Sequence, residues 1–242
     1  MYSVSDLKGM LFIDIETAAN YRDLEELKNE GPDGLYDLWL KKARTIREYG
    51  SEKGELTEDE LYINAAALYP EFGRIITISI GQIKFDEVGI AQDGNIRSFY
   101  GNDEAELLQE FCGIMSAVFS KNSNVKLTGH NIKKFDMPWI VKKCLINGII
   151  PPHQFHFQKL KPWENCLLDT YDIWKFGGMN GASLDLLCSV FGIPSPKGST
   201  VAGPEVSGQY WDGNLEAIKD YCELDVKATM NVMLKMSNME II

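Results

Sequence analysis

The sequence predicts an α/β fold, a mixed β-sheet flanked by helices on both faces, with a helical insertion after the first strand. Three observations lead to it. An apolar run carrying two acids lies at 11–17, a pair of strands follows at 74–100, and helices and strands then alternate. Antiparallel strands followed by such alternation give a sheet covered on both sides. Because 45% of the 242 residues are hydrophobic, the chain can bury a sizeable core, and we expect residues 1–242 to form one domain.

The first strand is expected from Leu11 to Thr17, since the run is rich in Ile and Phe. Side chains alternate along a strand, so Asp14 and Glu16 should point to the same face, about 7 Å apart. Apolar residues on both faces indicate a central strand. Buried charges need a partner or a metal ion. The alternative is a strand that surfaces at its end, where both acids are solvated.

The segment 21–69 is expected to be a helical insertion between the first two strands. Helical patterns and glycine-rich breaks alternate along it, and Thr57 with Glu60 fits a capping box. We expect helices at 23–28, 35–46 and 58–68. A structural cap over the sheet is the favoured interpretation. The alternative is a lid that offers Trp39, Lys41, Lys42 and Arg44 to a substrate.

The rest of the chain supplies the remaining strands and helices. Hydrophobic periodicity and capping residues locate them. We expect strands at 74–85, 96–100, 125–129 and 167–170, with a turn at 92–95. We expect helices at 103–120, 136–147, 171–176, 183–192 and 214–236.

The charge of the chain restricts its partners. With 35 acidic and 24 basic residues, the net charge is -11, so the protein as a whole should not attract nucleic acid through its long-range field. A nucleic-acid partner would need a local basic surface or bridging metal ions. Six lysines near one candidate motif are expected to form such a surface, with a solvated helix face as the alternative: Lys121, Lys126, Lys133, Lys134, Lys142 and Lys143.

The cysteines and the apolar segments exclude other classes of protein. Five cysteines lie far apart with no Cys-x-x-Cys pair, which makes zinc sites and a disulfide framework unexpected. No apolar run reaches the length of a membrane span. We therefore expect a soluble cytoplasmic protein.

Two further acids complete a candidate site. Asp136 follows a predicted strand, and Tyr221 and Asp225 lie four residues apart on the last helix, so they share a face. Each has a simpler interpretation, because Asp136 could complement a helix dipole and the helical pair could lie on a half-exposed face. Carboxylates are hard oxygen ligands, suited to Mg²⁺ or Mn²⁺. The candidate metal ligands are Asp14, Glu16, Asp136 and Asp225.

These residues carry a resemblance to a known superfamily. The motifs Asp14-x-Glu16, Asn131-x-x-x-Phe135-Asp136 and Tyr221-x-x-x-Asp225 resemble the three motifs of the DEDD 3′-5′ exonucleases, in the tyrosine branch called DEDDy. The stretches 70–75 and 195–197 are similar to predicted exonucleases related to the proofreading domain of family B DNA polymerases. The resemblance implies a ribonuclease H-like fold and hydrolysis of nucleic acid to nucleoside 5′-monophosphates with two divalent ions.

The resemblance also implies a role for each residue. Asp14 would bridge both ions, Glu16 and Asp225 would complete the first, and Asp136 would hold the second. A tyrosine has a pKa near 10, so Tyr221 is expected to orient the attacking water rather than act as a base. Contacts to the substrate are expected from Thr17, Ala18, Asn131 and Phe135.

The expected partner is the 3′ end of single-stranded nucleic acid, with DNA preferred over RNA. A polymerase or repair partner is conceivable, but the sequence identifies none. Two alternatives remain, an exonuclease that trims RNA 3′ ends and a non-catalytic binding or scaffold module on the same fold. Retention of the four acids and Tyr221 argues against the second alternative.

Overall fold

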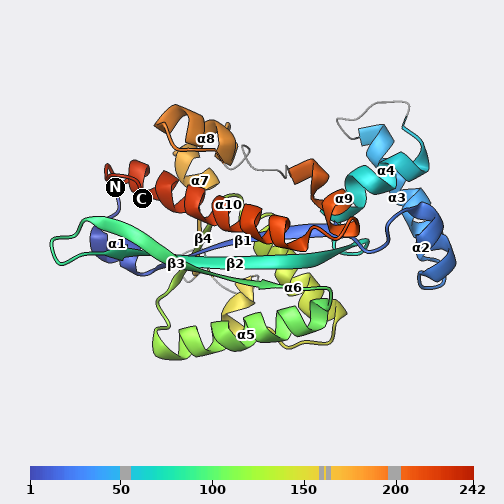
Figure 1. Cartoon of the computed structure of the whole chain (residues 1–242), viewed down its shortest axis with the longest axis horizontal. Helices are drawn as coiled ribbons and strands as arrows, with labels where there is room; N and C mark the ends of the chain where they lie inside the picture. Colours follow the sequence, from blue (N-terminus) through green and yellow to red (C-terminus); the bar gives the residue numbers. More distant parts are fainter. Residues whose placement is uncertain (50–55, 158–160, 162–164, 196–202) are drawn as a thin grey trace.

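A five-stranded mixed sheet forms the centre of the molecule. The computed structural model describes residues 1–49, 56–157, 161, 165–195 and 203–242 (Figure 1). The strand order is β3-β2-β1-β4-β5, with β1 antiparallel to β2 and parallel to β4. The prediction of a central first strand is therefore confirmed, as is the α/β fold class. The strands are β1 (Met10–Ala19), β2 (Gly73–Phe85), β3 (Ala91–Tyr100), β4 (Lys126–Gly129) and β5 (Leu167–Asp169).

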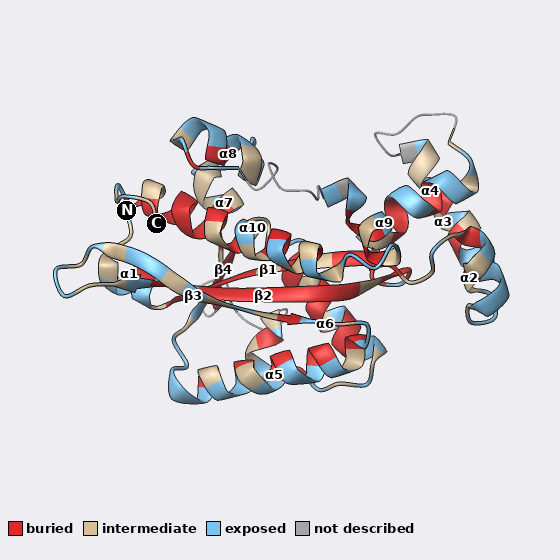
Figure 2. Cartoon of the chain, in the orientation of Figure 1, coloured by how far each residue is buried: buried red, intermediate tan, exposed pale blue. Residues whose placement is uncertain are grey.

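Helices cover both faces of this sheet. On one face lie α5 (Glu104–Lys121) and α6 (Asp136–Ile146), and on the other lie α7 (Thr170–Lys175), α8 (Leu184–Phe191), α9 (Val206–Trp211) and α10 (Leu215–Met236) (Figure 1). The middle of the sheet is buried between them (Figure 2). Gly81 allows α10 to approach β2 closely, because a Cβ atom there would lie 2.2 Å from Cε of Met230. A short helix, α1 (Val4–Lys8), precedes β1.

The two faces of β1 serve different cores. Ile13 and Ile15 belong to the hydrophobic cluster that includes Phe111 of α5 and Ile140 of α6. Phe12 packs instead against residues of α10. Since side chains alternate along a strand, Asp14 lies on the α10 side with Phe12. The apolar pattern of the strand thus decides which helix meets the acids.

The register of β1 on β2 contains one irregularity. Glu16 pairs with Thr77 and Thr17 pairs with Ile75, so Ile76 of β2 is left as an extra residue. A β-bulge of this kind bends the strand and increases its local twist, and bulges are common next to active sites. The irregularity lies directly after Glu16.

The predicted turn at 92–95 is wrong. These residues lie inside β3, which begins at Ala91, and the chain reverses at 86–90. The Asp86 carboxylate stabilises that turn by accepting the backbone N–H groups of Val88 and Ile90. Gly94 instead sits beside β2, where a Cβ atom would lie 1.8 Å from the carbonyl oxygen of Gln82. The glycine therefore marks a close contact within the hairpin rather than its turn.

The insertion after β1 consists of helices packed around a core of their own. They are α2 (Leu24–Glu30), α3 (Leu35–Tyr49) and α4 (Glu58–Ala65), followed by the 3₁₀ turn η1 (Ala66–Leu68). Buried Trp39 contacts the rings of Tyr62 and Phe72 edge to face, at centroid distances of 5.0 and 5.1 Å. The predicted capping box of Thr57 and Glu60 is present.

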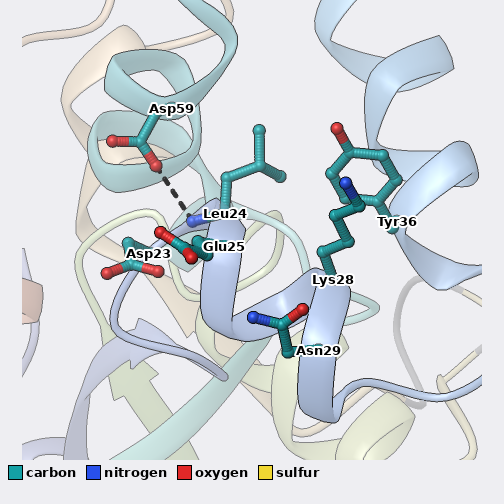
Figure 3. Close-up of a pocket in the computed structure, with 7 residues that line it drawn as sticks. All are labelled: Asp23, Leu24, Glu25, Lys28, Asn29, Tyr36 and Asp59. Atoms are coloured by element: carbon teal, nitrogen blue, oxygen red, sulfur yellow. Dashed lines mark hydrogen bonds between the residues drawn. The ribbon is translucent and has the colours of Figure 1, made fainter.

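A hollow of about 420 Å³ lies on the outside of this insertion, between α2, α3 and α4. Figure 3 shows Asp59 accepting the backbone N–H of Leu24, at 3.0 Å, which ties α4 to the start of α2. Lys28 lies over the ring of Tyr36 on the other side of the hollow. These contacts hold the three helices together as one unit.

The remaining sequence expectations agree with the structure closely, apart from short elements. The boundaries of the predicted helices differ by a few residues, and the 3₁₀ turns η2 (His153–Phe155) and η5 (Gly203–Glu205) and the helices α1 and α9 were not expected. A helix as short as α1 or α9 shows little periodicity, and neither was recognised, whereas the equally short α7 was predicted at 171–176. Within the described residues, no helix combines the length and apolar character needed to cross a membrane.

Candidate active site

Three acids meet where β1 passes under α10. Asp14 and Glu16 come from the strand and Asp225 comes from the helix, and their carboxylate oxygens lie within 4.8 Å of one another. All three side chains are half-buried. Oxygens this close can meet at one cation after small rotations of the side chains, so the group could hold a metal ion.

The electrostatics of these acids reflect burial and mutual repulsion. Burial raises the pKa of Asp14 well above its ordinary value, and the charges of Asp225, Asp136 and Glu16 raise it further. The pKa of Glu16 is raised well above its ordinary value by burial, and then by Asp225 and Asp136. Like charges in one buried site disfavour each other's ionisation. A bound cation would remove that repulsion, so the site is complementary to positive charge.

Asp136 approaches the group from the N-terminus of α6. Its side chain is buried, and burial raises its pKa from 3.8 to about 7, although a hydrogen bond from the backbone N–H of Ile15 lowers it. That hydrogen bond connects Asp136 to the strand residue between Asp14 and Glu16. Asp136 thus lines the same cleft but lies outside the group of three acids whose oxygens are within 4.8 Å of one another. The oxygens of all four carboxylates suit a hard divalent cation.

Tyr221 lies one helical turn before Asp225, as its spacing predicts. The side chain is buried, and its hydroxyl forms a hydrogen bond with the Asp225 carboxylate. Burial raises the pKa of Tyr221, and the charges of Asp225 and Glu16 raise it further. The phenol is therefore neutral at physiological pH and acts as a hydrogen-bond donor.

Cys222 follows Tyr221 and forms hydrogen bonds with Asp14. Its thiol donates to the backbone oxygen of Asp14 at 3.4 Å and to the Oδ2 atom at 3.5 Å. Burial raises the pKa of Cys222 well above its ordinary value, as do the charges of Asp14 and Glu16. The thiol stays protonated and serves as a weak donor that fixes one carboxylate.

The acids open into a cleft of about 690 Å³. Three of the predicted substrate-contact residues line it, namely Thr17, Asn131 and Phe135. Ala18 does not line the cleft. It is fully buried and packs in a cluster with Ile76. The predicted contacts are thus brought together except for the Ala18 side chain.

The cleft has a second wall that the sequence analysis did not identify. Ile63, Asn64, Ala67 and Leu68 of α4 and η1 face the acids across it. Ile63 and Leu68 are 43% and 56% exposed, so their apolar side chains are available to a ligand in the cleft. The Thr17 hydroxyl donates to the carbonyl oxygen of Ala67 at 2.7 Å and fastens this wall to β1.

Asp169 is a further residue that sequence reasoning missed. It is buried at the end of β5 and accepts the backbone N–H groups of Asn131 and Lys133, at 2.8 and 3.2 Å. Asn131 has φ of 62°, a left-handed conformation that asparagine tolerates better than most residues. Asp169 therefore holds the loop that carries Asn131 and Phe135. Its position after a short apolar strand was the available signal.

The six lysines expected to form one basic surface are scattered, so that prediction is wrong. Lys143 is buried, pairs with Glu104 at 3.1 Å and donates to the carbonyl oxygen of Gly73. Lys121 ends α5, on the other face of the sheet from α10. Lys126 pairs with Met10, roughly 13 Å along the strand from Asp14. Lys133 and Lys134 alone follow β4 into the loop beside the cleft.

Comparisons with known proteins relate the chain to one family and one similar fold. A family model described as "Predicted 3'-5' exonuclease related to the exonuclease domain of PolB" matches residues 68–241. Among solved structures, the chain is similar to the family B DNA polymerase from the hyperthermophilic archaeon Pyrobaculum calidifontis, with a TM-score of 0.52 and 14% identity. That match covers 94% of this chain and 24% of the polymerase, so the chain spans about a quarter of its length. A search of curated proteins gave no match.

Proposed function

Since the chain belongs to the family of predicted 3′-5′ exonucleases related to the exonuclease domain of PolB, we propose that it is a metal-dependent enzyme of the DEDDy type. It shortens single-stranded nucleic acid from the 3′ end and releases nucleoside 5′-monophosphates. The observation that carries this proposal is the convergence of Asp14, Glu16 and Asp225 within 4.8 Å at an open cleft. The preference for DNA over RNA rests on the relationship to a polymerase domain alone.

The four carboxylates would hold two divalent ions, Mg²⁺ or Mn²⁺. The all-oxygen donor set supports this assignment, as do the burial and mutual repulsion that raise the pKa values of Asp14 and Glu16. Such ions supply an activated water and stabilise the charge on the leaving 3′ oxygen. By resemblance, Asp14, Glu16 and Asp225 would hold one ion, and Asp136 together with Asp14 would hold the other.

Tyr221 would position the attacking water. Its raised pKa keeps the phenol protonated, so it is unsuited to accept a proton at neutral pH. Its hydroxyl already bonds Asp225, which places a donor at the edge of the acid cluster. A positioned hydrogen bond of this kind orients the nucleophile without taking part in proton transfer.

Thr17, Asn131 and Phe135 would contact the terminal nucleotides of the substrate. Phe135 and Asn131 line the cleft on a loop that Asp169 holds in place, so both are pre-organised. Phe135 offers an aromatic surface against which a base can stack. The backbone near Thr17 and Ala18 stays a proposed contact by resemblance alone. A single domain spanning 1–242, a cytoplasmic location and a polymerase or repair partner stay predictions from the sequence.

The experiment that tests this function follows the shortening of 5′-labelled oligonucleotides. Single-stranded DNA and RNA of the same sequence are incubated with the protein in Mg²⁺, in Mn²⁺ and in EDTA, and the products are resolved on a sequencing gel. We expect a ladder that grows from the 3′ end, faster on DNA, and no ladder in EDTA. Asp14→Asn is the control for a contaminating nuclease. No shortening in either metal would support the non-catalytic alternative, and faster shortening of RNA would support RNA trimming.

A further inference from the structure

A cationic and aromatic surface lies next to the cleft, on the side opposite the insertion. It consists of Lys134 in the loop before α6, Tyr171 and Lys175 of α7, and Phe176 with Met179 in the loop that follows. Lys175 lies 4.9 Å and Lys134 lies 5.8 Å from the centre of the Tyr171 ring. One tyrosine ring thus brings together two lysines that are far apart in the sequence. We call these five residues the α7 surface.

The α7 surface is continuous with the cleft through His130. His130 lines the cleft, and its ring contacts that of Tyr171 at a centroid distance of 5.8 Å. The imidazole also bonds the backbone of Ala182, at the far end of the loop after α7. The cleft wall and the α7 surface therefore share one side chain.

The charge on this surface is positive in an acidic protein. Lys133 pairs with Asp172 at 3.0 Å, so those two charges offset each other. Among the residues that the structure describes, neither Lys134 nor Lys175 has an acidic partner within ion-pair distance. The chain carries a net charge of -11, so two uncompensated ammonium groups beside the cleft are a local exception. Such a patch attracts phosphates at short range.

The loop at 176–181 presents apolar side chains to solvent. Phe176 is 89% exposed and Met179 is 93% exposed. Phe176 ends α7 with φ of 47°, a left-handed conformation that is rare for a bulky residue and usually belongs to glycine. Gly181 packs flat on Tyr171, where a Cβ atom would lie 2.1 Å from Cζ of the ring. The loop is thus anchored at Tyr171 while Phe176 points outward.

We propose that the α7 surface binds the nucleotides that precede the scissile 3′ end of the single strand. Lys134 and Lys175 contact phosphates, and Phe176 and Met179 contact bases, the combination by which proteins hold single strands without reading sequence. This inference rests on the proposed exonuclease function. The α7 surface would be a second binding site for the single strand, outside the cleft. None of the four acids belongs to it, nor does Tyr221.

The test compares a long and a short substrate. KM and kcat are measured on thymidylate 12-mers and 3-mers for the wild type, Lys134→Ala, Lys175→Ala and Phe176→Asn, since asparagine tolerates the left-handed conformation. We expect KM for the 12-mer to rise about 5- to 20-fold, and to rise less for the 3-mer, because lost stacking and phosphate contacts act only on upstream nucleotides. Each lysine variant should also reduce the salt dependence of 12-mer binding by about one phosphate contact.

Lys121→Ala is the matched control, because it removes one exposed charge on the opposite face of the sheet. A change in the ratio of the two KM values below twofold in all three variants would overturn the proposal. An equal change in the control would overturn it too, since net charge would then suffice. If the wild type degrades neither substrate, the proposed exonuclease function is rejected independently of the α7 surface. Fluorescence anisotropy with a labelled 12-mer then tests whether the α7 surface binds the strand. Equal binding by wild type and variants in that measurement rejects it.

Discussion

The two walls of the cleft differ in composition and in what holds them. One wall carries the acids, which come from β1, α6 and α10 and lie against the large core of the sheet. The other carries Ile63 and Leu68, which come from α4 and η1 and rest on the separate core around Trp39. The family model begins at residue 68, so β1 with Asp14 and Glu16 lies outside the matched range, as does nearly all of the insertion.

This difference in composition suggests that one wall determines the rate of the reaction and the other determines how well the substrate binds. The acid wall should tolerate few substitutions, because each carboxylate is positioned by a strand or helix that also belongs to the core. The insertion wall can change its side chains without disturbing the acids, since it meets β1 through few contacts, among them the hydrogen bond from Thr17 to Ala67. We therefore expect substitutions in the first wall to lower kcat and substitutions in the second to raise KM.

The largest effect is expected for the acid wall itself. Asp225→Ala removes a ligand and leaves the cleft open, so kcat should fall roughly 1,000-fold or more, since a bound metal contributes several kcal/mol to the transition state. Single-turnover rates on a labelled oligonucleotide measure this. A loss smaller than tenfold, with the far-ultraviolet circular dichroism spectrum unchanged, would remove Asp225 from the proposed metal site.

A smaller effect is expected for Tyr221→Phe, which keeps the ring and all four carboxylates. Loss of one positioned hydrogen bond should lower the single-turnover rate about 10- to 1,000-fold, with little change in substrate affinity. The comparison with Asp225→Ala ranks the two contributions within one wall. A rate within about twofold of wild type, under ~0.5 kcal/mol, would leave Tyr221 with a packing role only.

The insertion wall should respond in KM. Replacing both Ile63 and Leu68 by Ser removes apolar surface facing the substrate, and we expect KM to rise about 5- to 10-fold, with a smaller change in kcat. Ile90→Ser is the control, because Ile90 is 56% exposed on the distant β2-β3 hairpin. A fall in kcat that exceeds the rise in KM would contradict the separation of the two walls.

The smallest effect is expected in stability. Without metal, Asp14→Asn relieves repulsion among the acids and should raise the melting temperature by about 2–6 °C, or roughly 1–2 kcal/mol at this chain length. Mg²⁺ should stabilise the wild type more than the variant, because it binds only the folded site. Differential scanning fluorimetry with EDTA or Mg²⁺ measures both, and a lower melting temperature for metal-free Asp14→Asn would argue against repulsion.

Burial of Asp136, together with the neighbouring acids, predicts a pH dependence. In the folded protein the pKa of Asp136 is about 7, above its ordinary value of 3.8, so the folded state holds this proton more tightly than the unfolded chain. The resulting stability is fully present below pH 4 and is lost as the pH rises to about 7. Melting temperatures of the metal-free wild type should therefore contain a component that falls between pH 4 and 7, and Asp136→Asn should make that fall smaller, while the raised pKa values of Asp14 and Glu16 keep contributions of the same sign. An identical pH profile in that variant would reject the shift.

Local patterns predicted most of the fold. Periods of two and four place Asp14 with Glu16 on one face of a strand and Tyr221 with Asp225 on one face of a helix. That the two pairs meet was implied by the resemblance to the exonuclease motifs, and the structure brings Asp14, Glu16 and Asp225 within 4.8 Å. The turn at 86–90 could not be predicted, because Gly94 resembles a turn residue. Glycine is required at position 94 by a close contact with Gln82 instead. The roles of Ile63, Leu68, Asp169 and Lys143 depend on tertiary neighbours from distant parts of the chain, and no local period encodes them.

The bond from Thr17 to Ala67 has a mechanical consequence. Thr17 follows Glu16 directly, at the point where the pairing of β1 with β2 is shifted by one residue. A displacement of η1 would therefore reach Glu16 through the single peptide unit that joins it to Thr17. In the proposed exonuclease, a nucleotide that presses on the insertion wall would shift the backbone that positions the Glu16 carboxylate.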